Sequence, residues 1–234
     1  MVCMLGPNGC GKSTLLRTLA DLQPALSGTY SLTGEAGLTA QRSNSVSGLT
    51  AQRSNSNAVS LVLTERLSLE STTVHDVVAL GRYPYTSFLG GLTDEDERVI
   101  SESLELVGFA DPTGENGISG TMFNAHSDGE KARILIAKAL AQQTPIILLD
   151  EPTAHLDLPH RIKILRLLRE LAHEQHKTIL ISTHELDLAL HLSDRILLMT
   201  PGKGIRLDTA EHLREQDAFT SAFGMNIFDF LVDS

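Results

Sequence analysis

The sequence has no tryptophan and only two cysteines among 234 residues, and it has no apolar run long enough to cross a bilayer. Its longest apolar segments, such as residues 146–149, have the length of a buried strand. One of the two cysteines, Cys10, lies inside a glycine-rich loop, so a disulfide framework does not fit. These shortages favour a chain of a reducing, cytoplasmic compartment.

Positive charge is also scarce. The formal net charge is −10, so nonspecific attraction to nucleic acid or anionic lipid is not expected to drive function. The length suits one domain that buries a sizeable core.

Residues 6–13 read GPNGCGKS and match the phosphate-binding pattern G-x-x-x-x-G-K-[ST] at every fixed position. Glycines let the backbone turn its N–H groups toward phosphate oxygens, Lys12 can reach the β- and γ-phosphates, and Ser13 can offer its hydroxyl to Mg²⁺. Apolar residues 2–5 predict a strand, and leucines from residue 15 onward predict a helix whose N-terminus favours phosphate. The alternative for residues 6–13 is a glycine-rich turn that matches the pattern by chance and has no phosphate-binding role. The candidate nucleotide contacts are Gly6, Pro7, Asn8, Gly9, Cys10, Gly11, Lys12, Ser13 and Thr14.

A second chemical site follows an all-apolar run at residues 146–149, which is typical of a parallel strand buried on both faces. Ligands bind at the carboxyl ends of such strands. There Asp150 would hold Mg²⁺, and Glu151 would polarise an attacking water as general base. Taken alone, the segment could equally be a strand followed by an acidic turn.

A third piece is the predicted strand 178–182, followed directly by Thr183 and His184. A histidine just past the carboxyl end of a strand can contact a γ-phosphate. For a lone histidine, a surface or helix-capping role is the plain alternative.

In this order, the pieces resemble the ATP-binding subunit of ABC transporters over essentially the whole chain. Residues 126–131, HSDGEK, resemble the signature motif of that family, with Ser127 as a natural N-cap for a helix over 132–141. Residues 154–157, AHLD, resemble the D-loop, and His184 resembles the switch histidine. The resemblance assigns Ser127, Gly129, Glu130 and Asp157 to ATP sites shared between two subunits.

The resemblance implies an α/β P-loop NTPase fold, with a mostly parallel core sheet and a helical subdomain at residues 70–142, as a single domain over residues 1–234. It implies ATP and Mg²⁺ as cofactors, and a dimer that sandwiches two ATP molecules. The implied partners are membrane permease subunits and, indirectly, a substrate-binding protein. The implied place is the cytoplasmic face of the inner membrane, as a peripheral subunit.

Two capped helices are expected in the insert, one starting after Thr73 and one after Thr93. The sequences of these two segments, TVHDVVALGRYPY and LTDEDERVI, resemble those of the subclass that imports iron–siderophore, haem or cobalamin. An ordinary helical hairpin explains the same residues. Farther on, we expect a helix at about 160–175, a strand at 195–199, and a short closing segment from residue 208.

The chain departs from the family pattern in its first half. The family places two strands and an adenine-stacking aromatic ahead of the glycine loop, so we expect either an upstream start or a truncated copy. Residues 37–47 are repeated at 48–58, which predicts a tandem-duplicated surface loop over residues 35–58. Thr64 takes the position of the family's glutamine and could still ligate Mg²⁺ through its hydroxyl.

The signature also departs from the pattern, with His126 in place of leucine and Asp128 in place of glycine. Two rival functions stay open at this point. One is a truncated, non-hydrolysing, vestigial ABC subunit, which the departures favour and the intact Lys12, Asp150, Glu151 and His184 oppose. The other is a soluble ABC ATPase of DNA repair or translation.

Overall fold

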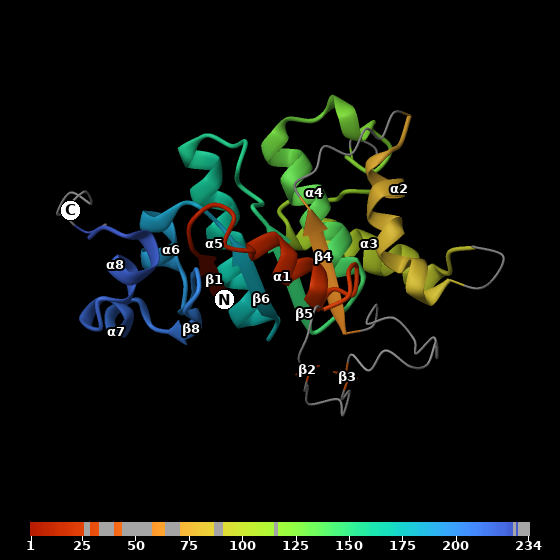
Figure 1. Ribbon diagram of the computed structural model, residues 1–234. Coiled ribbons are helices and arrows are strands. Elements are labelled where there is room, and N and C mark those ends of the chain that lie inside the picture. The colour runs from red at the N-terminus through yellow and green to blue at the C-terminus, as the bar shows by residue number, and fades with distance from the viewer. Residues whose placement is uncertain are drawn as a thin grey trace.

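The computed structural model describes residues 1–25, 29–32, 40–43, 58–63, 71–86, 91–114, 117–226 and 228 (Figure 1). Its strands are β1 (Val2–Leu5), β2 (Thr29–Leu32), β3 (Ala40–Ser43), β4 (Val59–Leu63), β5 (Ile146–Asp150), β6 (Thr178–Ser182), β7 (Arg195–Thr200) and β8 (Gly204–Asp208). Its α-helices are α1 (Lys12–Leu19), α2 (Val74–Ala79), α3 (Asp94–Leu106), α4 (Asp128–Ala141), α5 (Leu158–Glu174), α6 (Leu186–Leu192), α7 (Ala210–Glu215) and α8 (Ala218–Phe223). Two 3-10 helices are η2 (Leu80–Tyr85) and η3 (Phe123–Ala125).

The central sheet has six strands in the order β4-β5-β6-β1-β7-β8. All neighbouring pairs are parallel except β7 and β8, which form an antiparallel edge. This is the mostly parallel α/β sheet that the resemblance implies. Because β4, β5, β6 and β1 are consecutive neighbours, the loops that leave their carboxyl ends meet at one edge of the sheet.

The two faces of the sheet carry separate cores, and β1 shows how the alternation works. Cys3 and Leu5 belong to the larger core, together with residues of α4, α5, α6 and α8. Met4 belongs to the smaller core, where Leu16 of α1 packs on the opposite face. Cys3 is fully buried in the larger core, and this burial raises the pKa of its thiol to about 11.

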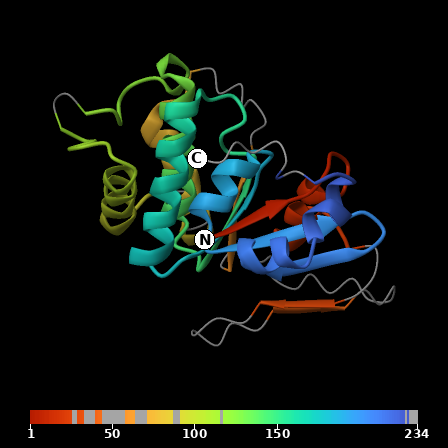
Figure 2. The same ribbon diagram turned by 90° about the vertical axis from the view of Figure 1, so that its left-hand side faces the viewer.

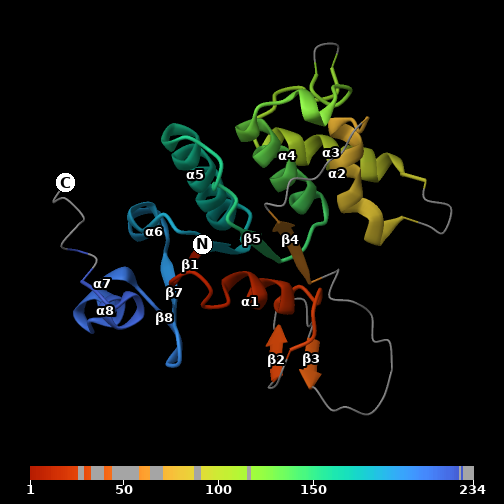
Figure 3. The same cartoon turned by 45° about the horizontal axis from the view of Figure 1, so that its top comes forward.

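Helices α2, α3 and α4 pack against one another as a group beside β4 (Figure 3). Thr73 and Thr93 each form a capping box with an aspartate three residues on, as the sequence predicts. Val74, Val77 and Val78 form the buried face of α2.

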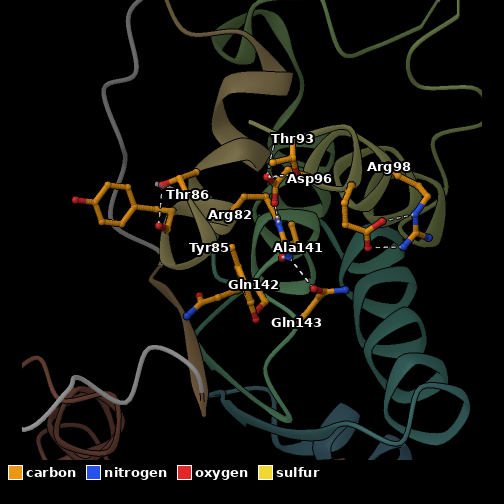
Figure 4. A network of polar contacts seen from close by, with 11 residues as sticks. Arg82, Tyr85, Thr86, Thr93, Asp96, Arg98, Ala141, Gln142 and Gln143 are labelled. Atoms are coloured by element: carbon orange, nitrogen blue, oxygen red, sulfur yellow. Dashed lines mark hydrogen bonds and ion pairs between the residues drawn. The ribbon is translucent and has the colours of Figure 1, made fainter. Parts of the chain in front are cut away.

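A buried arginine joins η2, α3 and α4 within this group (Figure 4). Arg82 donates from Nε to Asp96 Oδ1 at 2.7 Å and from Nη1 to the carbonyl of Ala141 at 2.8 Å. Gly81 lies against α4 so closely that a Cβ there would be 2.3 Å from the carbonyl oxygen of Lys138. The close packing therefore requires glycine at this position.

Strands β2 and β3 form a separate antiparallel ribbon, which lies apart from the central sheet in Figure 2. Most of the duplicated segment 35–58 lies outside the described residues, and so does Thr64. The predictions made for both therefore stay predictions.

Two helices begin earlier than the sequence-based expectation. The signature helix begins at Asp128 rather than at residue 132, because Ser127 caps it directly. Helix α5 begins at Leu158, since Asp157 is its N-cap and Pro159 fits the first turn. The closing segment contains α7 and α8, of which α8 packs on β7. Within the described ranges, no helix is long and apolar enough to span a membrane.

Candidate functional site

The glycine loop leaves β1 and ends at the first turn of α1, as the motif predicts. Gly9 and Gly11 have φ angles of 77° and 101°, which glycine adopts without strain. A Cβ on Gly6 would lie 2.7 Å from the carbonyl oxygen of Met199 on β7, so the loop passes too close to that strand for a side chain. The remaining loop positions, Pro7, Asn8, Cys10 and Thr14, lie in the same turn or at the start of α1.

Lys12 reaches back across this loop. Its side chain is 6% exposed, and Nζ donates to the carbonyl oxygens of Gly6 at 2.9 Å and Pro7 at 3.3 Å. The ammonium group is thus held inside the loop, where it can form hydrogen bonds to phosphate oxygens.

Ser13 and Asp150 come together from opposite ends of the chain. Ser13 Oγ donates to Asp150 Oδ1 at 3.0 Å. Hydroxyl and carboxylate oxygens are the kind of ligand that Mg²⁺ binds, and here two of them lie close together. The two residues therefore fit the magnesium ligation that the motif predicts.

Ser182 was missed by the sequence analysis, although it is the last residue of the predicted strand 178–182. Its hydroxyl donates to Asp150 Oδ1 at 2.6 Å, and it accepts the backbone N–H of Glu151 at 3.0 Å. Ser182 is fully buried. A serine directly after the apolar residues 179–181 was the signal that could have identified it.

Glu151 and His184 meet where β5 and β6 end. Glu151 has a φ of 50°, a left-handed conformation that is strained for a residue with a Cβ. The bond from its N–H to Ser182 holds it there. His184 Nε2 lies 2.5 Å from Glu151 Oε1, and both side chains are partly exposed. The structure thus places both candidate catalytic groups side by side at the solvent-facing edge of the site.

The signature residues lie at the start of α4, on a different element from the glycine loop. Ser127 and Glu130 form a reciprocal capping box: Glu130 N–H donates to Ser127 Oγ at 3.3 Å, and Ser127 N–H donates to Glu130 Oε2 at 3.0 Å. Hydrogen bonds from the Ser127 side chain and backbone lower the pKa of Glu130. Gly129 is buried, and Asp128 is exposed.

Asp157 caps the next helix, α5. The backbone N–H of His160 donates to its Oδ1 at 3.1 Å, and His160 Nδ1 contacts the same oxygen at 2.5 Å. Two hydrogen bonds lower the pKa of the Asp157 carboxyl. The larger effect comes from the His160 side chain, and the second from the His160 backbone N–H. Asp157 is therefore an exposed anion whose orientation is fixed.

A phosphate-binding loop between a strand and a helix, with an aspartate at the carboxyl end of another strand of the same sheet bonded to its serine, defines a P-loop nucleoside triphosphatase fold. Residues 1–154 match the family model described as ABC transporter. The chain belongs to this family. The mostly parallel sheet and the order of the motifs agree with that membership.

The relatives of the chain include ATP-binding subunits of importers. It is 35% identical over 220 residues to the iron(3+)-hydroxamate import ATP-binding protein FhuC of Bacillus subtilis, covering 94% of this chain and 76% of that protein. Solved structures with the same fold include an inward-facing, putative metal-chelate type ABC transporter, with a TM-score of 0.75, 24% identity, and coverage of 96% and 78%. Another is a dimeric ATP-binding cassette in a post-hydrolysis state with ADP and Pi, with a TM-score of 0.68, 25% identity, and coverage of 89% and 84%.

Proposed function

We propose that this chain binds Mg-ATP, hydrolyses it as one half of a dimer, and thereby powers a membrane importer for an iron–siderophore, haem or cobalamin. The observation that carries the proposal is the junction of Ser13 and Asp150 at 3.0 Å beside the buried Lys12. The likeness to an iron(3+)-hydroxamate import subunit supports the cargo class.

Each residue has a role in this proposal. The backbone N–H groups of the glycine loop and the Lys12 ammonium hold the phosphates, while Ser13 and Asp150 hold the metal. When bound, Mg²⁺ withdraws charge from the phosphate oxygens. Ser182 fixes Asp150 through its hydroxyl.

Glu151 takes the proton of the attacking water in this proposal. Its backbone is pinned to Ser182, and its carboxylate is held at 2.5 Å by His184, so the base is positioned before a water arrives. In the same proposal, His184 contacts the γ-phosphate.

The helical group supports a permease partner. Leu80, Tyr83 and Tyr85 on η2 are 50%, 78% and 45% exposed. Arg82 directly precedes Tyr83 in the chain and is buried, with its guanidinium 4.0 Å from the centre of the Tyr85 ring. A fixed apolar surface of this kind is typical of a protein interface. Docking there would place the subunit at the cytoplasmic face of the membrane; a substrate-binding protein would join on the other side.

The test is ATP-dependent dimerisation of Glu151→Gln. The amide keeps the size of the side chain but accepts no proton, so ATP should bind, turnover should stop, and a dimer should accumulate in size-exclusion chromatography. Glu170→Gln, on the exposed side of α5, is the matched control and should hydrolyse normally. A Glu151→Gln variant that stays monomeric and still hydrolyses ATP would contradict the proposal.

A further inference from the structure

The start of α5 links two loops that are far apart in the sequence. His160 is bonded to Asp157 through Nδ1 and through its backbone N–H, on the D-loop side. The other edge of the same imidazole faces α4: a Cβ built on Gly129 would lie 3.0 Å from His160 Cδ2. One side chain therefore contacts the residue that resembles the D-loop acid and lies against the signature helix (α4 and α5 in Figure 1).

The partner of His160, Asp157, determines which ring nitrogen carries the hydrogen. An ionised carboxylate accepts hydrogen bonds and donates none, and hydrogen bonding lowers the pKa of Asp157. His160 Nδ1 therefore carries a hydrogen and donates it. This bond fixes the ring, so the imidazole cannot swing away from α4 without losing Asp157.

The backbone conformation at position 129 does not require a glycine. It lies within the first turn of α4, outside the residues with positive φ, where any amino acid fits the backbone. Its nearest surrounding atoms belong to the His160 ring. The ring that approaches Gly129 therefore leaves little room for a side chain at this position.

We propose that His160 is a positioning residue that ties Asp157 to the signature helix, so that one subunit presents both loops to its partner's ATP in fixed register. The inference rests on the proposed function, because it takes the two loops to meet ATP across a dimer. A plain capping role predicts something different. The capping bond comes from the backbone N–H of residue 160, and that bond survives any substitution of the side chain except proline.

The first test measures ATP-dependent dimerisation in the Glu151→Gln background by analytical ultracentrifugation. His160→Ala should weaken each of the two shared sites about fivefold, the upper range for a partly exposed ion-paired hydrogen bond, and the dimer constant therefore about 25-fold. His160→Asn should stay close to the parent, because the asparagine amide can replace the Nδ1 donor. His191→Ala, whose ring contacts only Asp187 on α6 among the contacts in the described residues, is the matched control and should have no effect.

The second test asks whether Gly129 and His160 act together. Gly129→Ala should weaken the dimer when His160 is present, because the new Cβ meets a ring that cannot yield freely. In the His160→Ala background the same substitution should weaken the dimer less, because the part of the loss that comes from the clash with the ring is gone. ATP binding to the monomer, measured with a fluorescent ATP analogue, should be the same in all of these variants.

The outcomes separate the inference from the proposed function. If Glu151→Gln alone does not dimerise with ATP, the proposed function fails and the inference falls with it. If Glu151→Gln dimerises, and His160→Ala and Gly129→Ala dimerise as tightly, the function stands and the positioning role is overturned. Equal losses from Gly129→Ala in both backgrounds would likewise overturn it.

Discussion

Replacing Arg82 by methionine should destabilise the protein strongly, because it breaks a buried ion pair while keeping most of the apolar stem. The side chains of Arg82 and Asp96 are each 4% exposed. Besides Asp96, the guanidinium satisfies the carbonyl of Ala141 and the amide oxygen of Gln143 at 2.7 Å. Removing one partner of such a pair costs about 3–5 kcal/mol.

The low end of that range applies, because Asp96 keeps two hydrogen bonds from Thr93. We therefore expect Arg82→Met to lose about 3 kcal/mol, which for a chain of this size lowers the melting temperature by about 6–12 °C. Thermal and urea unfolding followed by circular dichroism would measure both quantities.

Arg98→Met is the matched control, on α3 in the same close-up (Figure 4). Arg98 also pairs with carboxylates, Glu95 and Glu102, but all three side chains are more than half exposed. Exposed pairs contribute at most about 1 kcal/mol. If Arg82→Met and Arg98→Met shift the melting temperature equally, the argument from burial is wrong.

The pH dependence has a definite sign. Hydrogen bonds from Thr93 and Arg82 lower the pKa of Asp96 from 3.8 to about 2. A lowered carboxyl pKa stabilises the fold fully above 3.8, and that stabilisation is lost as the pH falls through 2. The difference in the free energy of unfolding between the parent and Arg82→Met should therefore be constant from neutral pH down to about 5. Below about pH 4 this difference should become smaller.

Two further predictions concern the site and the repeat. Ser182→Ala should leave the fold intact but weaken Mg-dependent ATP binding by about 1–2 kcal/mol, because Asp150 loses a 2.6 Å hydrogen bond; a magnesium titration would show the shift, and an unchanged titration would contradict the role given to Ser182. Deleting residues 48–58 should leave ATP turnover unchanged if the repeat is an enlarged surface loop, and a measured loss of turnover would show that the repeat contributes to function.

Much of the site was predictable because it is built from short motifs at the ends of apolar strands. The phosphate loop needs only its local glycines and lysine. The meeting of that loop with Asp150 and His184 follows once the strands are parallel neighbours, since their carboxyl ends share an edge.

Other features depend on contacts that no local pattern carries. The link between Ser182 and Asp150 requires that β5 and β6 pair in one register. The positive φ of Glu151 depends on an anchor from another strand. The approach of His160 to Gly129 depends on how α4 packs on α5, and nothing in either helix alone predicts it.

The central claim is that this chain turns over ATP with Mg²⁺, and the most direct measurement is phosphate release from Mg-ATP by the chain as it stands. Lys12→Ala is the blank, and Lys203→Ala, in the turn between β7 and β8, is the control. The account predicts turnover by the parent and by Lys203→Ala, with none by Lys12→Ala. Turnover that persists in Lys12→Ala, or a parent that binds no ATP, would contradict it.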